Sequence, residues 1–125
     1  MNITVKTEKT NDFMARIREA FTSLDKGEKP EVSYAISFDD PNDLLSFLTR
    51  NRLTLFKSIR DHKRVTMPEL AHEMRRDSSS IRRDVNRLEE VGLVHSWLEV
   101  NPKGHGKIRV VEPAATDSIL LQAAL

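Results

Sequence analysis

The sequence predicts an α+β fold, a winged helix-turn-helix domain with a β-α-β extension on its N-terminal side. Three patterns carry this prediction. Strand and helix patterns alternate over residues 3–38, two short helices with a tight turn between them fit residues 67–91, and a β-hairpin fits residues 93–112. Two helices followed by a hairpin give the winged-helix order. The expected segments are the extension over residues 1–38, the winged domain over residues 39–112 and an apolar tail over residues 113–125.

The N-terminal extension is predicted from two strands and a helix between them. Residues 3–7 and 32–38 have strand patterns, and residues 12–26 repeat apolar side chains at helical spacing. Neither strand has an evident partner sheet. The extension is therefore either a small cap on the winged domain or a surface for dimerisation or for a toxin. Pairing of two copies across a two-fold axis favours a homodimer.

Two helices are expected between the extension and the helix-turn-helix. Asp40 should cap the first of them, with Pro41 at its first position, and the second should begin at Arg50. The side chains expected to face inward are Leu44, Leu45 and Leu48 in the first helix, and Leu53, Phe56 and Ile59 in the second.

The helix-turn-helix is predicted to begin with a capping box. Thr66 caps the helix, Pro68 is tolerated in its first turn, and Glu69 completes the box. The turn around residues 76–78 is short, and serines at the start of the next helix are good caps. The buried face of the first helix is expected to hold Leu70, Ala71 and Met74.

The second helix, over residues 79–91, is predicted to bury one side and expose the other. Ile81, Val85 and Leu88 recur at i, i+4 and i+7, and Gly92 ends the helix. At about 100° per residue, three polar side chains point away from that stripe. These side chains are Ser79, Arg83 and Asn86, and Arg82 and Arg87 lie on the two flanks.

Such a helix suits the major groove of duplex DNA. It is about 20 Å long, and arginine and asparagine can pair bidentately with guanine and adenine. We therefore predict base contacts from Ser79, Arg83 and Asn86. Phosphate contacts are predicted from neighbouring side chains, namely Ser78, Ser80, Arg82 and Arg87.

A solvated amphipathic helix is the alternative, with its arginines paired to Asp84, Glu89 and Glu90. The hairpin after the helix favours DNA binding, because a turn sequence over residues 101–106 places basic side chains at or near its tip. These predicted phosphate contacts are Lys103, His105 and Lys107.

Two sequence patterns support the same interpretation. The first, F-x-D-P-x-x-L-x-x-x-L-T-x-x-R, begins at Phe38, and the second, L-A-x-x-x-x-R-D-x-x-x-x-x-R-D-V-x-x-L-E-x-x-G-L-V, begins at Leu70. With them, residues 38–112 resemble the MarR-like winged helix-turn-helix transcriptional regulators, and in particular small DNA-binding proteins often encoded beside a toxin. This resemblance implies the antitoxin of a type II toxin–antitoxin pair that represses its own operon. It also implies that Asp84 orients Arg83.

The charge distribution agrees with a phosphate partner, although the net charge is only +1. Residues 1–49 carry 6 basic and 9 acidic side chains, residues 50–112 carry 14 and 9, and the remainder carries Asp117 alone. The positive excess therefore lies on the predicted winged domain. The absence of cysteine and of an apolar N-terminal run predicts a cytoplasmic protein without disulfides.

Enzyme chemistry finds no support in the sequence. His72 and Glu73 lack the second histidine of the zinc-protease pattern, and the remaining histidines show no metal spacing. No catalytic residue, metal or cofactor is therefore expected.

The tail over residues 118–125 is nearly all apolar, and it is expected to be buried away from solvent. It is either a last helical turn packed on the core or on a dimer partner, or a peptide that docks into a toxin. The alternative function is accordingly a protein-interaction module that neutralises a toxin, with DNA binding secondary or absent. An RNA partner has no sequence feature of its own.

Overall fold

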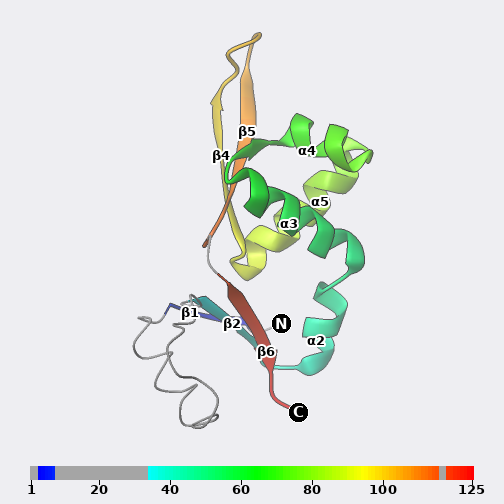
Figure 1. The fold of residues 1–125 in the computed structure, drawn as a ribbon, viewed down its shortest axis with the longest axis vertical. Helices are drawn as coiled ribbons and strands as arrows, with labels where there is room; N and C mark the ends of the chain where they lie inside the picture. Colours follow the sequence, from blue (N-terminus) through cyan, green and yellow to red (C-terminus); the bar gives the residue numbers. More distant parts are fainter. Residues whose placement is uncertain (1–2, 8–33, 116–117) are drawn as a thin grey trace, which may run out of the picture. The chain divides into compact units, whose positions relative to one another are not determined.

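The computed structural model describes residues 3–7, 34–115 and 118–125, whose elements are drawn in Figure 1. The chain divides into two compact units. The terminal unit comprises residues 1–44 and 117–125, and the winged unit comprises residues 45–116.

The terminal unit holds a three-stranded sheet in the order β1-β2-β6. β1 (Ile3–Thr7) runs antiparallel to β2 (Tyr34–Phe38), and β6 (Ile119–Ala123) runs parallel to β2. Both strands predicted in the extension are confirmed. The helix predicted over residues 12–26 lies outside the described residues.

The C-terminal tail forms the strand β6, so the prediction of a last helical turn is wrong. Its side chains alternate between half-buried (Ile119, Leu121, Ala123) and exposed (Leu120, Gln122). An apolar run this short carries no periodicity that separates a helix from a strand, and pairing with β2 decides the outcome. Because β1 and β2 find their partners within one chain, unpaired strands no longer argue for a homodimer.

α2 (Pro41–Phe47) begins where predicted, since the Asp40 carboxylate accepts a hydrogen bond from the backbone N–H two residues on, at 2.9 Å. Of its predicted inner face, Leu44 is half-buried, but the prediction is wrong for Leu45 and Leu48. Leu45 and Leu48 are 73% and 43% exposed, whereas Phe47 is fully buried. The helix ends at Phe47, so Leu48 lies beyond it and the aromatic ring takes the inward position.

α3 (Arg50–His62) begins as predicted and buries Leu55, Phe56 and Ile59. Leu53 was expected to face inward, but it is 40% exposed. The reason is helical geometry, because Leu53 lies about 160° of helix rotation away from the buried Leu55.

α4 (Met67–Met74) begins with the predicted capping box. The amide N–H of Glu69 donates to Thr66 Oγ1 at 3.3 Å, and the Glu69 carboxylate accepts from the Thr66 amide at 3.2 Å. The helix ends at Arg75, which adopts the left-handed conformation with φ 55°. Leu70 is fully buried on its inner face.

α5 (Ser78–Val91) is capped by Asp77, whose carboxylate accepts from the Ser80 amide at 2.7 Å. The cap is therefore an aspartate and not one of the predicted serines, because the turn lies one residue earlier than expected and α5 begins at Ser78. Gly92 ends α5 as predicted, with φ 92°. The predicted buried stripe is confirmed, with Ile81, Val85 and Leu88 at most 1% exposed.

The winged unit closes with an antiparallel sheet in the order β3-β5-β4. β4 (Val94–Val100) and β5 (Lys107–Pro113) form the predicted hairpin, which projects beyond the helices in Figure 1. β3 (Val65–Thr66) pairs with β5 and was not predicted, because two residues carry no readable alternation. Among the described residues, none of the helices combines the length and the apolar character needed to span a lipid bilayer.

Candidate nucleic-acid interface

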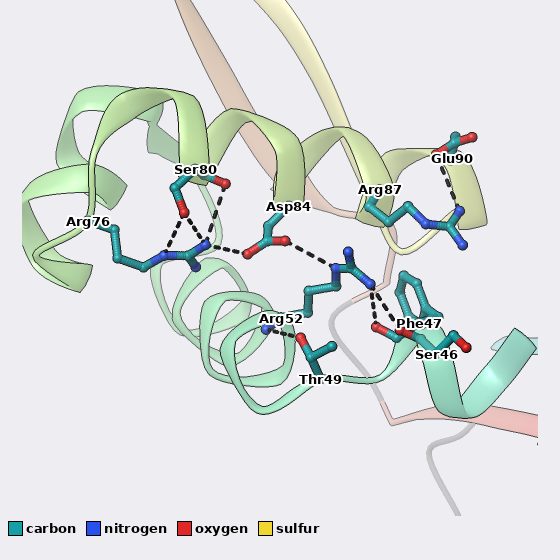
Figure 2. A network of polar contacts seen from close by, with 9 residues as sticks. All are labelled: Ser46, Phe47, Thr49, Arg52, Arg76, Ser80, Asp84, Arg87 and Glu90. Carbon is teal, nitrogen blue, oxygen red and sulfur yellow. Dashed lines mark hydrogen bonds and ion pairs between the residues drawn. The ribbon is translucent and has the colours of Figure 1, made fainter.

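The inner side of α5 carries one charged residue, Asp84, which is 9% exposed. Its two carboxylate oxygens pair with two arginines, Arg52 Nε at 3.1 Å and Arg76 Nη2 at 2.6 Å (Figure 2). The expectation that Asp84 orients Arg83 is therefore wrong. Asp84 lies beside Val85 on the buried side and faces the other helices (Figure 2). Arg83 is exposed.

Both arginines of this Arg52–Asp84–Arg76 triad are also tied to other parts of the winged unit. Arg52 Nη1 donates to the carbonyl oxygens of Phe47 at 2.9 Å and Ser46 at 3.3 Å, at the end of α2. Arg76 Nε and Nη2 donate to Ser80 Oγ at 3.1 and 2.5 Å. The triad thus joins the end of α2, the start of α3, the turn before α5 and α5 itself.

Sequence reasoning missed the triad, although a signal was present. Asp84 stands directly before Val85 and three residues after Ile81, on the side of the helix that the apolar stripe marks as buried. A buried carboxylate needs a cationic partner, so its position alone demanded one. The identity of the partners was not readable, because Arg52 lies 32 residues away.

The outer side of α5 holds the predicted base-contacting side chains. Ser79, Arg83 and Asn86 are all exposed, and Arg82 is exposed beside them. Within the described part of the chain, neither Arg82 nor Arg83 makes a hydrogen bond or an ion pair. The alternative of a solvated helix with internally paired arginines does not describe these two residues.

Arg87 does match that alternative in part. Its side chain is 24% exposed and pairs with Glu90 at 3.3 Å, and its guanidinium carbon lies 5.6 Å from the centre of the Phe47 ring. Arg52 lies over the same ring at 5.8 Å. Phe47, at the end of α2, is thus in contact with one arginine from α3 and one from α5.

The predicted phosphate-contacting serines differ in how accessible they are. Ser78 is exposed at the first position of α5. Ser80 is half-buried, and its hydroxyl accepts hydrogen bonds from Arg76. The structure therefore brings Ser78 to the outer surface and places the Ser80 hydroxyl in the contacts beneath the helix.

The wing is fixed to α5 by Glu89. Its carboxylate accepts from the amide and the hydroxyl of Ser96 on β4, at 2.7 and 2.6 Å, and from Arg109 on β5 at 3.5 Å. This contact sets the position of the hairpin relative to the helix. Glu89 is therefore occupied by the hairpin and does not neutralise Arg82 or Arg83.

The tip of the wing is a closed basic loop. The amide of Asn101 donates to the Gly106 carbonyl at 3.1 Å, and the Asn101 side chain accepts from the Lys103 amide at 3.0 Å. Gly106 has φ 84°, which a side chain would strain. Lys103, His105 and Lys107 are all exposed there, as the predicted phosphate contacts require.

A second charged cluster lies on the hairpin in the half nearer its tip, where Glu99 pairs with Ile108 next to the loop. Arg64 pairs with Glu99 and lies over the Trp97 ring at 5.7 Å, while the Trp97 indole N–H donates to Glu99 at 2.7 Å. The indole hydrogen bond, followed by Arg64, lowers the pKa of the Glu99 carboxyl from its ordinary value of 4.5.

The whole of this arrangement lies in the segment that defines the chain's family. The model of the HVO_A0114 family matches residues 47–113, just over half of the chain. The chain belongs to the HVO_A0114 family. The matched segment runs from the end of α2 to the last residue of β5, so the triad, the outer side of α5 and the wing are all features of the HVO_A0114 region of this chain.

Three solved structures are similar to this HVO_A0114 family member. A mutant of E. coli MarR complexed with operator DNA is 24% identical over 53% of this chain and 45% of that chain, with a TM-score of 0.44. A possible transcriptional regulator from Methanosarcina mazei Go1 is 20% identical over 59% and 65%, with a TM-score of 0.49. The transcriptional regulator PA4135 is 20% identical over 82% and 63%, with a TM-score of 0.43.

The chain spans less than two thirds of the length of each of these three proteins. No curated protein matches it. In the described part of the HVO_A0114 chain, no three histidine, aspartate or glutamate side chains come together in a way that could hold a metal ion.

Proposed function

We propose that this HVO_A0114 family member is a sequence-specific duplex-DNA-binding transcriptional regulator that represses its own operon. One observation carries the proposal. Arg82 and Arg83 are exposed and have no internal partner among the described residues, on the same side of α5 as Ser79 and Asn86. The acidic side chains that could neutralise these arginines are engaged elsewhere, Asp84 in the triad and Glu89 at the wing.

The outer side of α5 then lies in the major groove. Ser79, Arg83 and Asn86 contact base edges, because they occupy the centre of the exposed side. The surrounding side chains contact phosphates and set the register. These are Ser78, Ser80, Arg82 and Arg87 on the helix, and Lys103, His105 and Lys107 on the wing. Ser80 contributes least, because its hydroxyl already binds Arg76.

A homodimer is part of the proposal. One recognition helix contacts only a few base pairs, so winged and helix-turn-helix proteins commonly read two half-sites as dimers. If about four basic side chains per subunit meet phosphates, a dimer releases counterions from about eight phosphates. The logarithm of the binding constant should then fall with the logarithm of the salt concentration with a slope of about −7.

Footprinting on the DNA upstream of the chain's own gene tests the proposal. A protected palindromic segment identifies the operator, and fluorescence anisotropy then compares the operator with a scrambled duplex of the same length. Lys57→Ala is the matched control, because it removes an exposed charge from α3 and leaves α5 and the wing intact. Equal affinity of the wild-type protein for both duplexes would overturn sequence-specific regulation.

An antitoxin role is the second candidate, and the separate terminal unit favours it. The sheet β1-β2-β6 is compact by itself and exposes Leu120, 38% accessible, on β6. Because β6 belongs to that sheet, deleting the tail would also disrupt it. Leu120→Asp is the better probe, tested by co-purification with the product of the neighbouring gene. Capture that is unchanged by Leu120→Asp excludes this strand as the docking surface.

A further inference from the structure

Stability alone does not explain the Arg52–Asp84–Arg76 triad. Two arginines share one carboxylate, which leaves an excess positive charge on side chains that are only 12 to 22% exposed. Arg76 Nη1 is buried without a hydrogen-bond partner among the described residues. Buried charge clusters of this kind can often be replaced by apolar side chains with no loss of stability. The arrangement therefore calls for another explanation.

The geometry of Arg52 supplies one. A single guanidinium donates through Nε to Asp84 in the middle of α5 and through Nη1 to the carbonyls of Ser46 and Phe47 at the end of α2 (Figure 2). It also stacks on the Phe47 ring, which Arg87 of α5 contacts as well. Arg52 therefore links the last residues of α2 to the side of α5 that lies directly behind the outer arginines.

We propose that Arg52 is a positioning residue, which fixes the rotation of α5 against the end of α2 and thereby places Arg83 and Asn86 for base contact. The inference rests on the proposed function for its DNA readout. Its mechanical part, the link between α2 and α5, stands independently of DNA. The orientation of α5 within the winged unit then depends on the end of α2. The boundary between the two units falls within α2.

Arg52→Met is the informative variant. It leaves Arg76 and Asp84 as a charge-balanced pair, so the fold is expected to persist. Arg60→Met is the matched control, because Arg60 lies on the same helix and stacks on buried Phe56 at 5.7 Å, but has no hydrogen bond to α5 among the described contacts. Arg52→Lys keeps the charge but lacks the fork that reaches Asp84 and the carbonyls together, so it should behave like Arg52→Met.

The DNA readout is the ratio of affinities for operator and scrambled duplex, measured well below the melting temperature. Arg52→Met should lower this ratio roughly tenfold and leave the salt slope unchanged, and in an Arg83→Ala background its effect should shrink to less than about twofold. A merely destabilising substitution would act equally in both backgrounds. The positioning role is overturned if folded Arg52→Met discriminates between operator and scrambled duplex as well as the wild type does. It is also overturned if Arg52→Met lowers the affinity ratio equally in the wild-type and Arg83→Ala backgrounds.

A DNA-free readout separates this inference from the proposed function. The chain contains no cysteine, so Leu45→Cys on α2 and Asn86→Cys on α5, both at exposed positions, can be spin-labelled specifically. The distance distribution between the labels should be narrow with Arg52 and shifted or broadened by Arg52→Met, but not by Arg60→Met. If the wild type fails to prefer an operator, the proposed function falls, and this distance measurement still decides the positioning role. An unchanged distribution in Arg52→Met refutes it.

Discussion

On the inner side of α5, Asp84 holds Arg52 and Arg76, whereas on the outer side Arg82 and Arg83 make no hydrogen bond or ion pair within the described residues. Arginine thus serves two purposes around one helix. The arginines on the inner side come from α3 and from the turn before α5, whereas those on the outer side belong to α5 itself. Arg83 and Asp84 are neighbours in sequence and point to opposite environments. Opposite charges at adjacent positions of a helix are therefore no evidence of contact, because side chains meet at spacings of three or four.

The largest expected effect is on the inner side. Asp84→Ala removes the anion between two partly buried guanidinium groups, which then repel each other. Breaking a buried ion pair in this way costs about 3–5 kcal/mol, so the free energy of unfolding from urea titration should fall by that amount. Arg83→Ala is the matched variant on the outer side, expected to stay within about 0.5 kcal/mol of wild type. Similar stabilities for the two variants would remove the distinction between the sides of α5.

Arg83→Ala should show its effect on DNA instead. Loss of a bidentate base contact costs about 1–3 kcal/mol of discrimination, so the affinity for the operator should fall while the affinity for a scrambled duplex changes little. Anisotropy titrations of both duplexes measure this difference. Equal operator affinities for Arg83→Ala and wild type would exclude Arg83 from base contact.

The two sides of α5 also differ in how well the sequence predicts them. The capping box, Gly92, the buried stripe of α5 and the hairpin are local signals, and each was predicted correctly. A few local details were wrong, such as the inward positions expected for Leu45, Leu48 and Leu53. The larger errors involve pairings between distant segments. Arg52 meets Asp84 across 32 residues, and β6 joins a strand from the other end of the chain. Local periodicity contains no information about such partners, because loop closure and packing select them.

The wing provides a smaller and different effect. Lys103→Ala removes an exposed charge from the loop tip, so it should weaken binding to every duplex alike and reduce the magnitude of the salt slope by about 0.9 per subunit. Arg87→Ala should change the slope less, because Arg87 already pairs with Glu90 and stacks on Phe47. Affinities measured across a series of salt concentrations compare the two. If Lys103→Ala lowered the affinity for the operator but not for a scrambled duplex, the phosphate contact proposed for Lys103 would be contradicted.

The smallest effect is in the half of the hairpin nearer its tip, where the pKa of Glu99 is lowered by the Trp97 indole and by Arg64. A lowered carboxyl pKa means that the interaction is present at neutral pH, above the ordinary value of 4.5, and is lost only as the pH falls through the lower folded value. Trp97 is the only tryptophan of the chain, so its fluorescence should report this step. The midpoint should lie below 4.5, and Glu99→Gln should abolish the step while operator discrimination by α5 stays intact. A midpoint at or above 4.5 would show that Glu99 is not held by these contacts in solution.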